Sequence, residues 1–248
     1  MSRDGLGGQE SGEPARSFTD VLRAEIVSGV FSPNERLVEA DLSDLYRVSR
    51  GTARAALTEL AKEGLVERQP NRGARVRALS AEEATELTEA RFAMEGLCAG
   101  HAARHATSEE AAELRALLSA MGEAAEAQDV IGYYSLVAQL GQRIRTFSRH
   151  RSAAALAERL LNQLAPYSTV DSYAPGRIKA SLKEFEAIVD AIARGDPEAA
   201  EAAMRHHRVA ITAARRDVAS RGASWRSLPQ SLASTTRSLS SSSSSPGA

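Results

Sequence analysis

Residues 47–60 read RVSRGTARAALTEL, which contains a helix start, an apolar helix face and three arginines. Ser49 is well placed to cap the helix, because its hydroxyl can accept a hydrogen bond from a free backbone N–H of the first turn. The apolar residues that follow recur at helical spacing, and Gly64 is a typical helix end. The residues of this face are Ala53, Ala56, Leu57 and Leu60. The stretch therefore predicts a helix that begins after Ser49 and carries Arg50 and Arg54 on its first turns.

The residues on either side complete a small three-helix domain with a hairpin. Apolar side chains recur at helical spacing over 18–26 and again over 42–45. After the third helix, residues 65–69 and 74–77 are short, partly alternating runs that flank a tight turn. Three helices followed by a β-hairpin wing is the order of a winged helix-turn-helix, which we expect over residues 16–78.

The helix that begins after Ser49 carries the charges that DNA binding requires. In a helix-turn-helix the second helix lies in the major groove, with its N-terminal side chains at the base edges. Residues 47–77 hold eight basic and three acidic side chains, although the whole chain has a formal net charge of −1; clustered positive charge favours phosphate contact. Arg50 and Arg54 share one helix face, and arginine can bind guanine O6 and N7 together. The alternative is that these arginines only solvate an exposed face.

The tip of the hairpin adds a second expected contact with DNA. Arg72 could enter the minor groove or hold a phosphate, and Gly73 gives the turn the backbone freedom that it needs. The DNA-binding residues predicted from the sequence are Arg47, Ser49, Arg50, Gly51, Thr52, Arg54, Arg72 and Gly73.

The sequence changes character near residues 78–80, where long Ala-, Leu-, Glu- and Arg-rich helical patterns begin. Without a strand signal, these patterns predict an all-helical bundle over residues 79–222. The tails, 1–15 and the Ser-rich 223–248, have compositions typical of disorder. The fold class is therefore mainly α. The six expected helices cover residues 82–105, 108–127, 130–148, 151–165, 174–194 and 197–220.

Several motifs resemble a known family of regulators. The N-terminal part resembles the signature of the GntR family of bacterial regulators in these stretches: IVSG at 26–29, LVE at 37–39, VSRGTARAAL at 48–57, EGLV at 63–66 and PNRG at 70–73. The remainder resembles the all-helical C-terminal (FCD) domain of the FadR-type subfamily, in RFAME at 91–95, AIARGD at 191–196 and AMRHH at 203–207. The resemblance implies a homodimer that binds a pseudo-palindromic double-stranded DNA operator and responds to a metabolite. The sequence departs from the family's usual residues at Asn34, Ala40 and Ala55. These differences bear on which operator sequence is read.

The resemblance also implies where a metal would bind. Many members of the subfamily hold a divalent ion through one Asp and three His inside the helical domain. The corresponding positions here are Val137, Gly141, Phe185 and His207, and of these only the histidine can donate to a metal. Three or four ligands are needed for a stable site, so we expect no metal and no other cofactor. The same replacements predict a drier cavity that accepts a more apolar effector, or a cavity that is partly filled.

Candidate effector-binding residues include the four metal positions and two arginines. Phe185 could instead be plain core, and His207 could hold the polar end of an effector or be a hydrogen-bonded core histidine. The arginines could hold an anion, because an arginine that faces a cavity needs a negative partner, or form surface or ion pairs. The full set is Arg91, Val137, Gly141, Arg177, Phe185 and His207.

A second candidate metal site lies on one predicted helix. Cys98, His101 and His105 are spaced to share a helix face, and a soft metal can use Cys with two His. No fourth ligand is evident in the sequence, so packing or surface roles are the alternative for these residues.

The remaining composition narrows the function class. A single cysteine excludes an internal disulfide, and no apolar run is long enough for a membrane span, so we expect a cytoplasmic protein. We find no phosphate loop, no nucleophile motif and no acid–base pair at a diagnostic spacing, so an enzyme is not expected. The sequence predicts a sequence-specific transcriptional regulator, in particular a repressor, controlled by a small-molecule effector. A metal-dependent regulator and a non-specific DNA-coating protein are the alternatives.

Overall fold

The computed structural model describes residues 16–69, 73–165 and 176–220, and for 214–220 only the helical backbone. The chain divides into two compact units, Met1–Arg77 and Ala78–Ala248, and each is described by itself. The tails that we expected to be disordered, 1–15 and 223–248, lie outside the described residues, as does Arg72.

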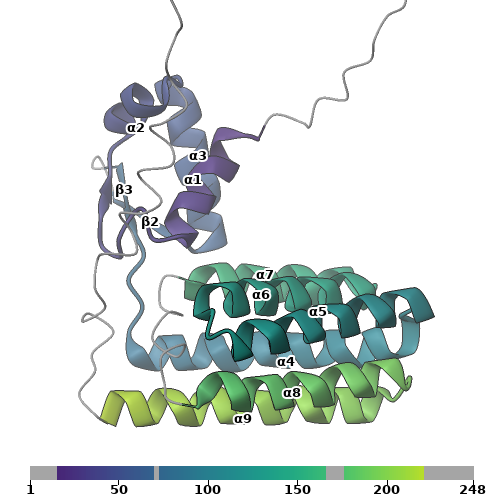
Figure 1. Ribbon diagram of the computed structural model, residues 1–248. Coiled ribbons are helices and arrows are strands. Elements are labelled where there is room, and N and C mark those ends of the chain that lie inside the picture. The colour runs from purple at the N-terminus through teal and green to yellow at the C-terminus, as the bar shows by residue number, and fades with distance from the viewer. Residues whose placement is uncertain (1–15, 70–72, 166–175, 221–248) are drawn as a thin grey trace, which may run out of the picture. The chain divides into compact units, whose positions relative to one another are not determined.

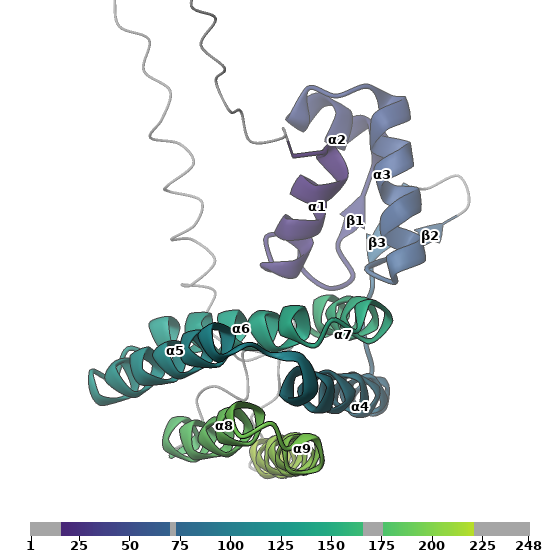
Figure 2. The same cartoon turned by 90° about the vertical axis from the view of Figure 1, so that its right-hand side faces the viewer.

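The first unit is a winged helix-turn-helix, as predicted (Figure 2). Its strands form one antiparallel sheet in the order β1-β3-β2. Its elements are α1 (Phe18–Val27), β1 (Arg36–Leu37), α2 (Glu39–Tyr46), α3 (Arg50–Glu63), β2 (Val66–Gln69) and β3 (Gly73–Val76).

The strand β1 was not predicted, so the wing is a three-stranded sheet and not a hairpin alone. Arg36 and Leu37 pair with Arg75 and Ala74 of β3. A strand of two residues is too short to show alternation, which is why the sequence pattern gave no sign of it. Leu37 is buried in the domain core, and it ties the sheet to the helices.

One core holds the first unit together and fixes the orientation of α3. Ala53, Ala56, Leu57 and Leu60 are buried and form the inner face of the helix. They pack with apolar side chains of α1 and the sheet, including Leu22 and Ile26. Because the inner face is occupied, the polar residues of α3 must lie on the opposite face.

The second unit is an all-helical bundle, also as predicted (Figure 1). The helix α4 contacts α6, α7, α8 and α9 and so lies at the centre of the bundle. Within the described residues, the helices of this unit are α4 (Ala81–His105), α5 (Ser108–Glu126), α6 (Val130–Phe147), α7 (Arg151–Leu164), α8 (Arg177–Ala193) and α9 (Pro197–Ser220).

Capping side chains set the starts of most of these helices. Ser80, Thr107 and Asp129 each accept a hydrogen bond from a backbone N–H of the first turn. Large apolar residues of α5, α6 and α8 then fill the core, among them Tyr133 and Ile188. Among the described helices, none is both long and apolar enough to cross a membrane.

Candidate nucleic-acid interface and effector cavity

The turn before α3 is built to present the start of that helix. Arg47 ends α2 in the left-handed backbone region, with φ of 53°. The Ser43 hydroxyl donates to the Val48 carbonyl oxygen at 2.6 Å, which holds the turn. Ser49 then caps α3, because its Oγ accepts a hydrogen bond from the Thr52 N–H at 3.0 Å.

Six of the eight predicted DNA-binding residues lie together at this turn and on the first turns of α3. All six are exposed, so their side chains and backbone are accessible to a ligand. They are Arg47, Ser49, Arg50, Gly51, Thr52 and Arg54. Within the described residues Arg50 has no carboxylate partner, which leaves its guanidinium available to bind an anion or a base.

Gly73 opens β3, where both its conformation and its space exclude other residues. Its φ is +82°, and a Cβ at this position would overlap the carbonyl oxygen of Leu37. The sequence argument for Gly73 concerned the tight turn, and the structure adds the close approach of β1.

Arg54 belongs to an ion cluster on the exposed face of the first unit. Its Nε and Nη2 atoms lie 2.9 and 2.8 Å from Oε2 of Glu39, at the start of α2. Arg68 of β2 lies 3.5 Å from the other Glu39 oxygen and donates to the Thr58 hydroxyl at 2.8 Å. The hydrogen bond from Arg54 holds the pKa of Glu39 below its ordinary value. Glu39 therefore connects the expected recognition helix to the wing.

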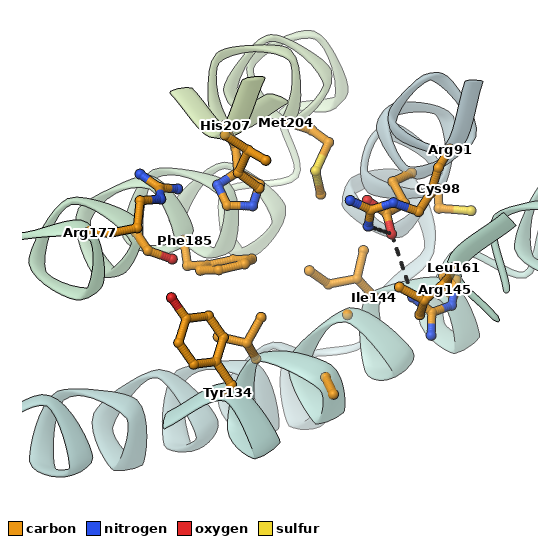
Figure 3. A pocket seen from close by; sticks show the side chains of 16 residues that line it. Arg91, Cys98, Tyr134, Ile144, Arg145, Leu161, Arg177, Phe185, Met204 and His207 are labelled. Carbon is orange, nitrogen blue, oxygen red and sulfur yellow. Dashed lines mark hydrogen bonds and ion pairs between the residues drawn. The ribbon is translucent and has the colours of Figure 1, made fainter. Parts of the chain in front are cut away.

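The second unit contains a partly open cavity of about 340 Å³ between α4, α6, α7, α8 and α9. Figure 3 shows its lining side chains. The structure brings all six sequence-predicted effector residues together here: Arg91, Val137, Gly141, Arg177, Phe185 and His207 line the cavity. Phe185 and His207 are buried as well, so each is part of the core and of the cavity wall.

A buried acid–base cluster occupies one end of the cavity. Arg177 donates two hydrogen bonds to Glu184, at 2.7 and 2.6 Å, and Nδ1 of His207 donates to Glu184 Oε2 at 2.6 Å. Burial acts to raise the pKa of Glu184, but the hydrogen bonds from Arg177 and His207 outweigh it and lower the pKa to about 2. The carboxylate is therefore ionised and uses both oxygens on these two partners.

A second cluster lies around Glu95. Arg91 Nη1 lies 2.9 Å from Glu95 Oε1, and Arg145 Nη1 lies 3.8 Å from the same oxygen. The Arg91 guanidinium also stacks on Phe92, with Cζ 4.0 Å from the ring centre. Cys98 lines the cavity nearby, and burial raises the pKa of its thiol.

The middle of the cavity is apolar, and its walls come mainly from α6, α7 and α9. They include Ile144, Leu161, Met204 and Ile211. We expected a drier cavity, because metal ligands are replaced by apolar groups, with Arg91 and Arg177 as candidate anion holders. The structure shows that the lining also carries charged groups, three of them arginines.

The donor set does not fit the metal that the fold suggests. Val137, Gly141 and Phe185 have no donor atoms, and Nδ1 of His207 is already bonded to Glu184. The other histidine group also lacks a suitable arrangement: His101 packs edge-on against His150, with ring centres 4.7 Å apart, while Cys98 is buried in the cavity wall. Among the residues that the structure describes, no group of three His, Cys, Asp or Glu could hold a metal.

Comparison with known protein families places both units. The model for bacterial regulatory proteins of the gntR family matches residues 15–76, and the FCD domain model matches residues 86–210, which is half of the chain. The chain belongs to the GntR family. It carries the helical C-terminal domain of the FadR-type regulators, and it is a transcriptional regulator rather than an enzyme.

Individual relatives agree with this membership. Over 201 residues, this GntR regulator is 31% identical to the "Probable D-xylose utilization operon transcriptional repressor" of Paenarthrobacter nicotinovorans, covering 78% of this chain and 84% of the relative. It is 26% identical to the "HTH-type transcriptional repressor RspR" of Escherichia coli K12, over 83% of this chain and 90% of the relative. The solved structure of Escherichia coli McbR/YncC has the same fold, with a TM-score of 0.67, 18% identity, and coverage of 80% of this chain and 95% of that chain.

Four charged residues of this GntR regulator were missed by the site prediction. Glu39, Glu95, Arg145 and Glu184 all contact or share a cluster with a residue that was predicted. A signal existed for Glu184, since it lies seven residues after Arg177 and therefore on the same face of α8. Glu95, four residues after Arg91, has the spacing of an ordinary surface pair, so the sequence alone gave no reason to place it inside.

Proposed function

We propose that this GntR-family regulator is a homodimeric, sequence-specific repressor that acts in the bacterial cytoplasm. It binds a pseudo-palindromic double-stranded operator through α3 and the wing, and a small-molecule effector in the helical domain controls the binding. The observation that carries the proposal is the capped start of α3, where Arg50 and Arg54 lie exposed on one helix face. Two relatives are named as repressors, which supports repression rather than activation.

The residues at the start of α3 have distinct expected roles. Arg50 and Arg54 read base edges, because a guanidinium can bind guanine O6 and N7 together. The exposed Thr52 and the backbone around Gly51 contact phosphate and fix the register of the helix. In the wing, Arg72 enters the minor groove or holds a phosphate, and Gly73 gives the turn the backbone freedom that it needs.

Control requires that the effector changes what the two recognition helices of a dimer can reach. Operator half-sites match the separation of these helices, so a small change in their spacing or mobility alters affinity. The residues around Leu79, which join the two units, act as the hinge in this proposal. The alternative of a non-specific DNA-coating protein predicts weak sequence preference and no effector response.

Selection of preferred duplexes from a random pool, using the full chain at physiological salt, tests the proposal. We expect one or a few related sequences with two-fold symmetry, bound by a species with twice the mass of the chain in sedimentation. Enrichment of no sequence over the starting pool would contradict the proposal. A screen of metabolites for release of the selected duplex then tests control by an effector.

A further inference from the structure

The start of α7 is capped by a histidine. The backbone N–H of Ala153 donates to Nδ1 of His150 at 3.2 Å, so an imidazole takes the place that a Ser, Thr or Asp side chain has at other helices of the bundle. An imidazole nitrogen accepts a hydrogen bond only while it carries no proton. The cap is therefore present in the neutral form of His150 and is lost in the protonated form, whose positive charge is also unfavourable at a helix N-terminus.

The same imidazole packs against a second histidine, on another helix. The ring of His150 lies edge-on against the ring of His101 on α4, with ring centres 4.7 Å apart, and the ring of His105 lies 5.8 Å from His101. The helix α7 packs mainly against α4, so the contact between His101 and His150 joins the two helices. Two protonated rings at this distance would repel each other, and the contact therefore favours the neutral forms.

The charges around the two histidines act in the same direction. Burial is the main cause that lowers the pKa of His101, and its basic neighbours lower it further, while one acid opposes them. Beside His150 along the chain, Arg149 is paired with Glu110 of α5, and Arg151 is exposed. The charged and titratable groups that act on His101 come from α4, the α6–α7 turn and α9: Arg104, His105, His150 and the acid Glu201.

The turn between α6 and α7 holds His150 in place without using its ring. Arg149 lies in the left-handed backbone region, with φ of 54°. The Ser148 hydroxyl accepts a hydrogen bond from the His150 N–H at 3.1 Å and donates to the Arg145 carbonyl oxygen at 2.6 Å. These bonds do not involve the imidazole, so the bond to Nδ1 is the one that protonation removes.

We propose that His101 and His150 form a proton-sensitive latch, which holds the start of α7 against α4 while both rings are neutral and releases it in mildly acidic solution. The pKa of a histidine is about 6.5 in the unfolded chain. Because the folded value of His101 is lower, the stability that it contributes is complete above that pH and is lost as the pH falls below it. Neither histidine is among the residues that line the cavity, so the latch responds to pH independently of an effector.

Hydrogen exchange of the full chain, corrected for the intrinsic exchange rate at each pH, tests the latch. Residues 151–160 are compared at about pH 7.5 and about pH 5.5, on either side of the ordinary histidine value. We expect the protection of these amides to fall by about fivefold to thirtyfold at the lower pH, because the N-cap is lost and the two rings repel each other. Protection in the second half of α5, residues 116–126, should stay the same.

Substitutions separate the cap from its titration. His150→Asn keeps a capping acceptor that does not titrate, so α7 should be protected at both pH values, whereas His150→Ala should lose protection at both. His101→Phe keeps a ring at the contact without a charge and should reduce the pH effect. His206→Asn is the matched control, since His206 is an exposed histidine on α9, and it should keep the wild-type response.

Four outcomes would overturn the latch. They are equal protection of α7 at the two pH values in the wild type, the full wild-type loss in His150→Asn, the full wild-type loss in His101→Phe, and a wild-type response in His150→Ala. If the Ala variant does not fold, the Asn and Phe variants decide. The measurement uses the chain without DNA, so its result does not depend on whether the protein selects an operator.

Discussion

Two glutamates of this protein hold arginines at nearly the same distance in different surroundings. Glu39 lies 2.8 Å from Arg54 on the exposed face of the first unit, and the side chain of Arg54 is 66% exposed. Glu184 lies 2.6 Å from Arg177 in the helical bundle, where the two side chains are 8% and 9% exposed. Judged by distance alone, the two ion pairs would be equally strong.

Exposure to solvent gives the two ion pairs different energies and suits them to different roles. An exposed ion pair typically contributes about 0–1 kcal/mol, because water and salt screen it. Arg54 can therefore leave or share Glu39 when a base or a phosphate arrives. Loss of one partner from a buried pair leaves a charge without compensation, which costs about 3–5 kcal/mol. The exposed cluster is suited to exchange, and the buried cluster is suited to hold one wall of the cavity in place.

The largest expected effect follows from removal of the buried acid. Glu184→Ala leaves Arg177 and His207 without their shared acceptor, so we expect the free energy of unfolding to fall by about 3–5 kcal/mol in urea titration. Glu186→Ala is the control, since Glu186 is exposed on the same helix and should change stability by less than about 0.5 kcal/mol. Similar losses in the two variants would show that burial does not separate the two kinds of pair.

The pH dependence of stability should carry the signature of the same residue. The pKa of Glu184 is about 2 in the folded protein and near 4.5 when the chain is unfolded. A lowered pKa stabilises the folded state above the unfolded value, and this stabilisation is lost as the pH falls from about 4.5 to about 2. The advantage of the wild type over Glu184→Gln should thus shrink by about 3 kcal/mol across that range. Parallel stability curves for the two proteins would contradict the assignment.

The exposed cluster predicts a change in DNA recognition without a change in stability. Arg54→Ala should weaken binding to the selected operator by about tenfold to a hundredfold, with little change on random duplex, because a base contact is lost. The unfolding temperature should stay the same, since the side chain is exposed. Lys62→Ala serves as the control, because Lys62 is an exposed basic residue at the other end of α3. Equal losses on operator and random duplex would mean that Arg54 contacts only phosphate.

The contrast between the two clusters also explains what could be predicted from the sequence. Helical periodicity and caps such as Ser49 located the helices of both units to within a few residues, because these signals are local. The strand β1 was missed because its two residues pair with a strand almost forty positions away. The local sequence pattern gives no information about such long-range strand pairing.

The cavity was harder to predict for a related reason. Val137, Phe185 and His207 were placed by helix register and by resemblance, and all three line the cavity. Arg145 was missed, and so was Glu184 in spite of its spacing from Arg177, because a charged residue within a helix normally indicates the solvent face. Arg145 pairs with Glu95 of α4, and Glu184 pairs with His207 of α9 as well as with Arg177 of its own helix, so only the assembled bundle shows that they lie inside.

The smallest effect is expected from Glu39, and it decides whether the exposed cluster has a function. Glu39→Gln removes a negative charge from the face that we propose to meet DNA, so affinity for random duplex should rise by about twofold to fivefold at low salt. Glu39 also bonds two nitrogens of Arg54 and so fixes the plane of its guanidinium, on which base reading depends. We therefore expect operator affinity to rise less than random affinity, or to fall, when both are measured at the same salt concentration. A rise of equal size on both duplexes would reduce Glu39 to a competing anion. Glu39 would then have no role in positioning Arg54 for base reading, and of the two glutamates only Glu184 would position its arginine.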